Sequence, residues 1–458
     1  MRVLIAGGGE VAFLVARRLI REGNEVTIVE EDPERVAHLE EILDAKIVCG
    51  SASSVRELRE AGIRDAEMLI AVTSVDEINL LACMIAQVES DVKVKVARIR
   101  THEADHWRRI CREAGIHIDL IIHPESEIVS RLLPVLRVPG VSDILDFAGG
   151  GVKIFGMNID SGNWVAGKTM EELDRAGPPA NSLIAFIFRG NQVIIPHGAD
   201  RLEPDDHVYI CTTAQNLEAD FRFMGLKAQA SLDRVFILGG KQIGIGLAQE
   251  LERQGVAVKL FEQSVERCEK ISALTRKTIV IHGDGTDEGT LVEENIEGVS
   301  AYLALTNDDE DNIIACLLAR KLGARKVVAL VNRLNYLAMA QRLGIHTIVS
   351  PRLTAVDRIL QFVRKGRVLS VTTFRQEEAE AIELIAAPGS KYVGKRLRDV
   401  RLPEGSIVGA IAKPTGDIVI PRGDAVIEAG DRVIFFTIES TVPKLESAFL
   451  HDPQRERV

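Results

Sequence analysis

The sequence has no long apolar run. Its longest stretch without Asp, Glu, Lys or Arg lies between Arg175 and Arg189 and contains two prolines. That stretch falls short of the roughly 18 apolar residues that a membrane-spanning helix needs. The chain also enters a predicted strand at Arg2-Val3, without the charged leader and apolar segment of a secretory signal. We therefore expect a protein that crosses no membrane and is located in the cytoplasm.

The chain also has few cysteines and no excess of positive charge. Its 6 cysteines are scattered without CxxC spacing, which predicts reduced, mostly buried thiols and no disulfide framework. Acidic residues outnumber basic ones by 67 to 56, and the net charge is −11. This balance argues against a nucleic-acid surface, so no nucleic-acid partner is expected. A length of 458 residues predicts about three or four domains.

What the sequence does contain is one nucleotide-binding pattern, present twice. A glycine-rich turn follows an apolar run at Gly7-Gly8-Gly9-Glu10-Val11 and again at Gly239-Gly240-Lys241-Gln242-Ile243. An acidic residue ends the next apolar run in each copy, Glu30 in the first and Glu262 in the second. Two such fingerprints in register, each with its downstream acid, are hard to obtain by chance.

Short apolar runs alternate with helical patterns through residues 1–123 and again through residues 232–350. In the first copy we expect strands at 3–6, 26–30, 47–49, 68–73, 92–99 and 116–122, and helices at 11–21, 33–43, 55–61, 77–87 and 102–114. Alternation of this length predicts a parallel sheet with helices on both faces. Each copy is therefore predicted to be a Rossmann-like N-lobe of the α/β class.

A different pattern follows each predicted N-lobe. Pro124 and Pro351 start connecting helices, 124–139 and 351–365, and the segments after them, 140–226 and 366–451, change to short β runs around one helix. In the first of these C-lobes we expect strands at 153–159, 182–188, 192–195 and 206–211 and a helix at 170–175. The predicted architecture is N-lobe, C-lobe, N-lobe, C-lobe, each C-lobe a small α+β unit, with residues 227–232 linking the halves.

The first fingerprint has every residue type that a dinucleotide site requires. Gly7 permits a tight turn after the strand, and Gly9 lets the backbone approach a pyrophosphate. The phosphates would lie on the amides at the start of the helix that follows, where unpaired N–H groups and the helix dipole favour an anion. Glu30 would accept hydrogen bonds from both ribose hydroxyls and repel a 2′-phosphate, which favours NAD(H) or an adenosine nucleotide over NADP(H). The alternative for Glu30 is a solvated acid.

Three further residues are candidates for the first site. Thr73 and Ser74 follow the fourth predicted strand, and Arg98 ends the fifth. The carboxyl ends of parallel strands form the edge at which ligands bind in such sheets. Arg98 could equally be a surface charge.

The second copy departs from the fingerprint. Lys241 replaces the middle glycine, and Val331 stands where the first copy has Arg98, whereas Glu262 and Thr306 remain. Two interpretations compete. The second copy is either a degenerate unit kept for its fold, or a site that uses Lys241 as a phosphate-binding cation for a shorter nucleotide such as ATP or ADP.

Two other motif matches are interpreted as accidental. The stretch 102–106 spells HExxH, the zinc-protease pattern, but it lies inside the repeated N-lobe, and its counterpart at 335–339 has no histidine. The stretch 162–169 matches the phosphate-binding P-loop. Its counterpart at 389–396 lacks the hydroxyl that would bind Mg²⁺, and the surrounding β-rich segment is too small for the sheet of such an enzyme. Neither metal nor phosphate is expected at these places.

The order and duplication of these segments resemble those of the RCK or KTN family of cytoplasmic regulators of potassium transport, and in particular its TrkA-type subunits. The resemblance covers residues 1 to about 450. It is carried by the two fingerprints, by Ala71–Asn79 and Leu305–Asn312, by Ala97–Arg100, and in the C-lobes by Val165–Lys168, Val393–Lys395 and Glu428–Asp431.

The resemblance implies a regulatory protein without catalytic residues. In such proteins the N-lobes bind NAD(H) and adenine nucleotides, and the chains assemble as a ring, a tetramer in this case, beneath a potassium channel or transporter in the membrane. Carried over residue by residue, the first site would be Gly7–Val11, Glu30, Thr73, Ser74 and Arg98. The second would be Gly239–Ile243, Glu262 and Thr306, where Lys241 and Val331 argue against a dinucleotide.

Two other classes of function remain open at this point. The same fingerprint serves NAD-dependent oxidoreductases, although the C-lobes offer no His, Lys or Tyr in both copies that could act on a substrate. A purely structural ring adaptor with relic sites is the other alternative. The fold alone cannot decide among these classes.

Overall fold

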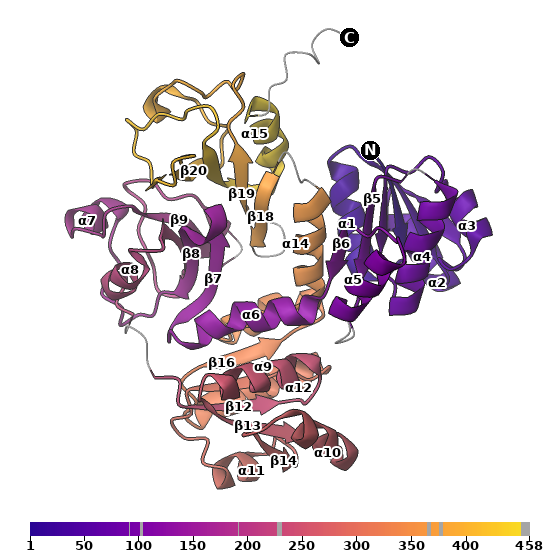
Figure 1. The fold of residues 1–458 in the computed structure, drawn as a ribbon. Coiled ribbons are helices and arrows are strands. Elements are labelled where there is room, and N and C mark those ends of the chain that lie inside the picture. The colour runs from indigo at the N-terminus through magenta and orange to yellow at the C-terminus, as the bar shows by residue number, and fades with distance from the viewer. Residues whose placement is uncertain are drawn as a thin grey trace. The chain divides into compact units, whose positions relative to one another are not determined.

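The computed structural model describes residues 1–90, 92–100, 104–190, 192–226, 231–363, 368–374 and 379–449. The chain forms two compact units (Figure 1). The first consists of Met1–Glu127 and Pro351–Val363, and the second of Ile128–Ser350 and Arg364–Val458. The predicted linker at 227–232 lies largely outside the described residues.

The first N-lobe is a six-stranded parallel sheet with the strand order β3-β2-β1-β4-β5-β6. Its strands are β1 (Arg2–Ala6), β2 (Glu25–Glu30), β3 (Lys46–Cys49), β4 (Met68–Ala71), β5 (Val94–Arg98) and β6 (Leu120–Ile122), and its helices are α1 (Glu10–Arg21), α2 (Pro33–Ile42), α3 (Val55–Glu60), α4 (Asp76–Glu89) and α5 (Ala104–Glu113). The order reverses between β1 and β4, and ligands bind at such a point in open α/β sheets. The predicted Rossmann-like architecture is confirmed.

The second N-lobe repeats this topology with the order β14-β13-β12-β15-β16-β17. Its strands are β12 (Arg234–Leu238), β13 (Ala257–Glu262), β14 (Ile279–His282), β15 (Ala301–Ala304), β16 (Val327–Leu330) and β17 (Thr347–Val349), and its helices are α9 (Gln242–Arg253), α10 (Val265–Leu274), α11 (Glu288–Glu293), α12 (Asp309–Lys321) and α13 (Leu334–Arg342). Strands β12, β15 and β16 are buried along their length or nearly so, as continuous apolar runs covered on both faces predict.

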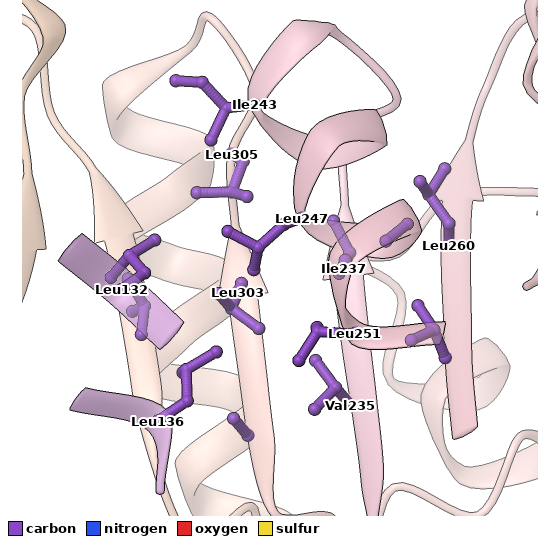
Figure 2. Close-up of a cluster of buried hydrophobic side chains, with 14 of the residues drawn as sticks. Leu132, Leu136, Val235, Ile237, Ile243, Leu247, Leu251, Leu260, Leu303 and Leu305 are labelled. Atoms are coloured by element: carbon purple, nitrogen blue, oxygen red, sulfur yellow. The ribbon is translucent and has the colours of Figure 1, made fainter. Parts of the chain in front are cut away.

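The two connecting helices each pack against the N-lobe of the other half of the sequence. From α6 (Pro124–Leu136), the side chains of Ile128, Leu132 and Leu136 enter the core of the second N-lobe (Figure 2). Helix α14 (Pro351–Val363) packs on α1 and β6 of the first. Three leucine or isoleucine side chains buried in this way contribute on the order of 5 kcal/mol of hydrophobic stabilisation. The two halves of the chain are therefore held together by exchanged helices, which the sequence pattern did not predict.

The C-lobes are antiparallel sheets with the orders β10-β9-β11-β8-β7 and β18-β19-β22-β20-β21. The first contains β7 (Val141–Phe147), β8 (Val152–Asn158), α7 (Met170–Arg175), β9 (Ser182–Arg189), β10 (Gln192–Ile194), β11 (His207–Thr213) and α8 (Leu217–Phe223), and the second contains β18 (Val368–Phe374), β19 (Ala379–Ile385), β20 (Ser406–Ala412), β21 (Ile418–Val419), β22 (Arg432–Ile438) and α15 (Val442–Phe449). Phe186 of the first lobe contacts Phe374 and Phe436 of the second, with ring centroids 5.6 and 5.2 Å apart. The two C-lobes thus share one aromatic core.

Two details of the predicted elements were wrong. The strand expected at 116–122 is only Leu120–Ile122, because Gly115 has a left-handed φ of 71° and the Ile116 N–H still bonds to the Cys111 carbonyl at the end of α5. Strand β7 and helix α8 were not predicted at all. Among the helices in the described ranges, none is both long and apolar enough to span a bilayer.

Candidate functional site

The turn between β1 and α1 contains three glycines, and the structural reason for a glycine differs among the three positions. Gly7 has a φ of 99°, and a Cβ there would meet the Thr73 backbone at 2.9 Å. A Cβ on Gly8 would meet the Leu39 side chain at 2.7 Å. A Cβ on Gly9 would meet no protein atom within 4 Å. Packing therefore explains the first two glycines, whereas the third leaves space beside the helix start, as a closely approaching phosphate group requires.

Glu30 lies at the carboxyl end of β2, next to this turn. It is buried, and its carboxylate accepts hydrogen bonds from the backbone N–H of Gly8 and, at 3.0 Å, of Asp32. These two amides fix the carboxylate at the sheet edge. Asp32 in turn caps α2 by accepting from the Glu34 N–H at 3.0 Å, with Pro33 at the first helical position, which is why α2 begins there. A carboxylate held in this way retains lone pairs for ribose hydroxyls.

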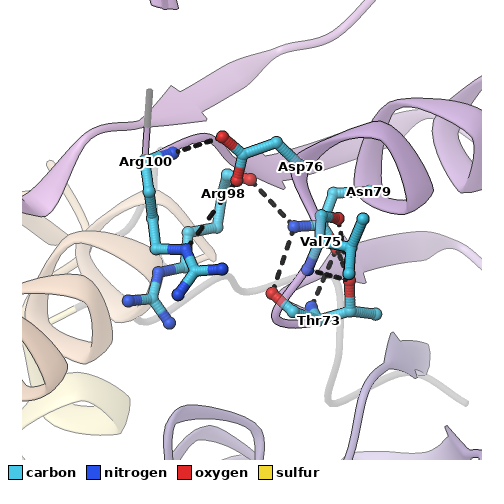
Figure 3. A network of polar contacts seen from close by, with 6 residues as sticks. All are labelled: Thr73, Val75, Asp76, Asn79, Arg98 and Arg100. Atoms are coloured by element: carbon cyan, nitrogen blue, oxygen red, sulfur yellow. Dashed lines mark hydrogen bonds and ion pairs between the residues drawn. The ribbon is translucent and has the colours of Figure 1, made fainter. Parts of the chain in front are cut away.

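The loop after β4 is tied to the end of β5 by an asparagine (Figure 3). The Asn79 side chain accepts from the Thr73 N–H and hydroxyl, at 2.8 and 2.7 Å, and donates to the Arg98 carbonyl at 2.9 Å. Asp76 likewise accepts from the Arg100 N–H at 2.9 Å. The hydroxyl, N–H and carbonyl of Thr73 are thus all used within the protein, while Ser74 beside it is exposed.

Arg98 is the half-buried cation at this edge. Burial lowers the pKa of its guanidinium, Arg100 adds to the effect, and the carboxylates of Glu125 and Asp76 oppose it. Among the described residues, Arg98 Nε and Glu125 Oε2 are buried without a hydrogen-bond partner. Buried polar atoms are rarely left unpaired, so this edge of the sheet has one donor and one acceptor that a bound ligand could satisfy.

Glu10 and Val11 begin α1 directly after the open glycine. Val11 is buried, so only its backbone N–H faces the turn. The Glu10 carboxylate is exposed and forms an ion pair with Arg352 of α14. The structure therefore brings together every residue predicted for the first site.

Packing accounts for the glycines of the second copy. Gly239 has a φ of 101°, and a Cβ there would meet the Leu305 carbonyl oxygen at 2.9 Å. A Cβ on Gly240 would meet Ile271 at 2.2 Å, and one on Gly244 would meet the Gly239 carbonyl oxygen at 2.1 Å. Lys241 stands at the position of Gly9 and is exposed. The glycines here are consistent with turn geometry alone.

The second carboxylate is occupied by an arginine. Glu262 accepts from the N–H of Gly240 and Ser264, at 3.2 and 3.1 Å, and from Arg267 Nε at 3.1 Å. Arg267 also donates to the Gly240 carbonyl at 2.6 Å. Burial raises the pKa of Glu262, but the hydrogen bonds from Ser264 and Arg267 outweigh it, and the pKa lies below its ordinary value.

Two cations consequently line the second turn. Burial and the charge of Arg267 lower the pKa of Lys241, while Glu262 opposes them. Gln242 begins α9 with a neutral side chain, and Ile243 and Val331 are buried. Thr306 repeats the arrangement of Thr73, with its N–H and hydroxyl bonded to Asn312 at 3.0 and 2.8 Å. Lys241 and Arg267 thus place an ammonium and a guanidinium beside the start of α9.

The two motif matches that were interpreted as accidental, at 102–106 and 162–169, form ordinary secondary structure and turns where they fall within the described residues. His102 and Glu103 lie outside the described residues, within which no cluster of metal-ligating side chains occurs. In the P-loop match, the Thr169 hydroxyl caps α7 by accepting from the Glu172 N–H at 3.2 Å, and the Gly167 N–H bonds to the Leu202 carbonyl at 2.7 Å. The hydroxyl and amide that would hold phosphate and metal are therefore engaged.

Sequence reasoning missed Asn79, Arg267 and Arg352. The repeat of Asn79 at Asn312 was visible as a register match, and a polar side chain after each fourth strand was the available signal. For Arg267 the available signal was Ser264, which replaces Asp32, the acidic partner of the counterpart Arg35. Arg352 is brought to the first site only by the packing of α14 on α1.

Solved structures share this fold. The GsuK channel bound to NAD superposes with a TM-score of 0.60 at 21% identity, over 98% of this chain and 79% of that chain. Identity at this level speaks for the shared fold alone.

Family models and curated proteins give a closer relationship. The TrkA-N domain matches residues 3–124 and 235–351, and the TrkA-C domain matches 154–225 and 381–450. The Trk system potassium uptake protein TrkA of Halomonas elongata is 35% identical over 90% of this chain and 91% of its own length. The protein of that name from Vibrio alginolyticus is 33% identical over 99% of both. The resemblance to the TrkA-type subunits is thereby confirmed, and the chain belongs to the TrkA family of potassium uptake proteins.

Proposed function

We propose that the chain is a nucleotide-sensing regulatory subunit of a membrane potassium uptake system. The first N-lobe binds NAD(H) and the second binds ATP or ADP, and the bound nucleotide biases the conformation of an assembly that controls potassium flux. Family membership supports potassium transport as the process and a regulatory, non-enzymatic role in it. The Rossmann-type lobes support nucleotides as the ligands.

The open space at Gly9, next to the buried carboxylate of Glu30, is the observation that carries the proposal. The other two glycines of the turn are required by packing, whereas an alanine at position 9 would fit the protein. Arg98 Nε and Glu125 Oε2, buried without partners among the described residues, lie at the same sheet edge. A channel of the same fold has been solved with NAD bound, which accords with this ligand.

The second site is proposed to take a nucleotide with a terminal phosphate. Lys241 stands where the first copy has Gly9, the glycine with open space beside it. A side chain at this position disfavours a dinucleotide, whose pyrophosphate links two nucleosides. Lys241 and Arg267 together provide an ammonium and a guanidinium beside the start of α9. Charged donors bind phosphate oxygens more strongly than neutral donors do, so ATP and ADP are favoured there.

We propose that four chains form a ring in the cytoplasm, attached to the inner face of the membrane through a potassium channel or transporter subunit. Exposed apolar side chains on α4 and α12 support contacts between copies. Leu81, Met84 and Val88 are spaced to lie on one face of α4, and Ile314 repeats Leu81 on α12. In a ring, nucleotides that prefer different lobe arrangements shift the equilibrium only by their difference in affinity.

The test is calorimetric titration of NADH, ATP and ADP into the full chain and into a Gly9→Asp variant. An aspartate at position 9 places bulk and negative charge where the pyrophosphate would lie, and it needs no strained backbone because Gly9 has a φ of −71°. We expect the variant to show no heat of NADH binding. Gly162→Asp is the matched control, because Gly162 also has open space around it, in the discounted P-loop stretch.

Unchanged NADH affinity in Gly9→Asp would mean that the first site is misassigned. A chain that binds none of the three nucleotides at millimolar concentration would be the structural adaptor. Stoichiometric oxidation of NADH with a metabolite would point to the oxidoreductase class.

A further inference from the structure

An arginine from the second half of the sequence lies at the first nucleotide site. Helix α14 packs on α1 and β6 within the first compact unit. At its first turn, Arg352 forms an ion pair with the carboxylate of Glu10, a residue 342 positions earlier in the chain. Burial lowers the pKa of the Arg352 guanidinium, but an arginine remains charged in proteins.

Glu10 creates a charge conflict for a nucleotide. It is the first residue of α1, directly after Gly9, so its carboxylate stands beside the amides on which the phosphates would rest. An acid at a helix start is favourable when the site is empty, but it repels a phosphate that takes the same place. The Arg352 guanidinium neutralises the Glu10 carboxylate, which removes this repulsion. It also adds hydrogen-bond donors beside the start of α1.

The second copy has side chains of different charge at the two equivalent positions. Gln242, neutral, stands in place of Glu10, and Arg352 of α14 corresponds to Glu125 of α6. Glu125 raises the pKa of Arg98, which burial lowers. The first site therefore combines an acid at the helix start with an arginine on the connecting helix. The second turn instead has two cations from its own lobe, Lys241 and Arg267.

We propose that Arg352 is a binding residue of the first nucleotide site, where it neutralises Glu10 and donates to the phosphates. This inference rests on the proposed binding of NAD(H) to the first N-lobe. Helix α14 follows β17 of the second N-lobe and precedes the second C-lobe in the chain. Nucleotide binding at the first site is thereby coupled directly to the connecting helix of the second half.

The experiment measures NADH binding to the full chain by fluorescence anisotropy in four variants. Arg352→Ala is expected to weaken binding about tenfold or more, the usual effect of losing a hydrogen bond to a charged group. Arg352→Lys retains part of the affinity, because it keeps the charge without the planar fork. Glu10→Gln binds at least as tightly as the wild type, and adding it to Arg352→Ala restores part of the loss.

Arg358→Ala is the matched control. Arg358 lies on the same helix and pairs with Glu127, with its Nε 3.4 Å from Oε1, so its loss perturbs α14 without touching the proposed site. We expect unchanged NADH affinity in this variant. Equal weakening by Arg358→Ala and Arg352→Ala would overturn the inference, because the effect would then come from the helix.

Wild-type affinity in Arg352→Ala would also overturn the inference, and it would leave nucleotide binding itself intact. Failure of the proposed function is recognised separately, since wild type and Gly9→Asp would then both fail to bind NADH. If Arg352→Ala does not fold, Arg352→Lys and Glu10→Gln decide, because a Glu10→Gln variant that binds more weakly than the wild type contradicts the proposed repulsion.

Discussion

A single exchange between the two copies changes the partner of the neighbouring arginine. In the first copy Asp32 pairs with Arg35, with Nε and Oδ2 3.4 Å apart. The second copy has Ser264 in that place, which uses its hydroxyl to cap α10 by accepting from the Arg267 N–H. Without an acidic partner three residues before it, the Arg267 side chain bonds to Glu262. The carboxylate that ends the second strand therefore accepts from backbone N–H groups in the first copy, and from backbone N–H groups and an arginine in the second.

The sequence located Glu262 and Lys241, and it contained the exchange of Asp32 for Ser264 but not the change of arginine partner that follows from it. Arg35 and Arg267 are the same residue type at equivalent positions, and only the competition among nearby carboxylates separates their roles. The open space at Gly9 was inferred correctly from the glycine pattern, because the strand, turn and helix that surround it are local in sequence. Arg352 belongs to the opposite case, since long-range packing alone brings it to Glu10.

At the residue scale we predict that Lys241 binds phosphate. In a Gly9→Asp background, in which the first site is blocked, Lys241→Ala should weaken ATP binding by about tenfold, the typical effect of losing one charged hydrogen bond. Calorimetry measures the ATP affinity. Lys270→Ala serves as the control, because Lys270 is exposed on α10 and pairs with Glu266. A Gly9→Asp chain that binds no ATP would show that the second copy is degenerate, and equal affinity with and without Lys241 would show that Lys241 does not bind the phosphate.

At the scale of elements, the corner between α6 and β7 depends on a buried lysine. Lys326, just before β16, donates from Nζ to the carbonyls of Val135, Val138 and Val141, the last two at 3.0 and 2.7 Å. Its neighbour Asp143 is half-buried in β7, and burial raises the pKa of that carboxyl, while hydrogen bonds from Tyr209 and Ser142 oppose the shift. The end of α6 is thereby attached to the second N-lobe.

This corner explains why β7 was not predicted. The strand contains two aspartates, Asp143 and Asp146, and acidic residues are depleted in strands. Asp143 is tolerated because Tyr209 donates to it at 3.0 Å and Lys326 is nearby, and both partners are remote in sequence. The parallel sheets were predictable because their strands are continuous apolar runs, which need no such partner.

We predict a pH-dependent role for Lys326 in stability. Burial lowers its pKa to about 7, whereas an unfolded lysine titrates near 10.4. Between these values the unfolded chain binds a proton that the folded chain lacks, so stability rises with pH by up to about 1.4 kcal/mol per unit. Lys326→Met should destabilise the protein by about 2 kcal/mol at pH 7, because three buried carbonyls lose their donor.

Thermal unfolding of wild type and Lys326→Met from pH 7 to pH 9.5 measures both effects. Only the wild type gains stability from this group, so the difference in unfolding temperature should widen as the pH rises. The exposed Lys277 provides the control, since Lys277→Met should parallel the wild type. A difference that stays constant with rising pH would show that Lys326 is protonated throughout the range.

At the scale of the whole molecule, each half of the sequence contributes to both compact units. Helix α14 belongs to the unit that contains the first N-lobe, and most of α6 belongs to the unit that contains the second. Because each helix leads into the C-lobe of its own half, a change in one N-lobe acts on a helix of the other half. If a ligand of one N-lobe prefers one arrangement, this connection couples the two halves.

The last prediction concerns assembly. Val88 is 84% exposed on α4 and Ile314 is 58% exposed on α12, and apolar side chains that are clustered at the surface mark protein interfaces. Val88→Asp combined with Ile314→Asp should reduce the mass measured by light scattering from that of a tetramer to that of a smaller species, because a buried unpaired carboxylate is costly.

Val292→Asp is the control, since Val292 is 55% exposed on a different helix, α11. The double variant should still bind NADH, which shows that it is folded. A wild-type chain that is monomeric, or a double variant of unchanged mass, would mean that copies do not meet through α4 and α12.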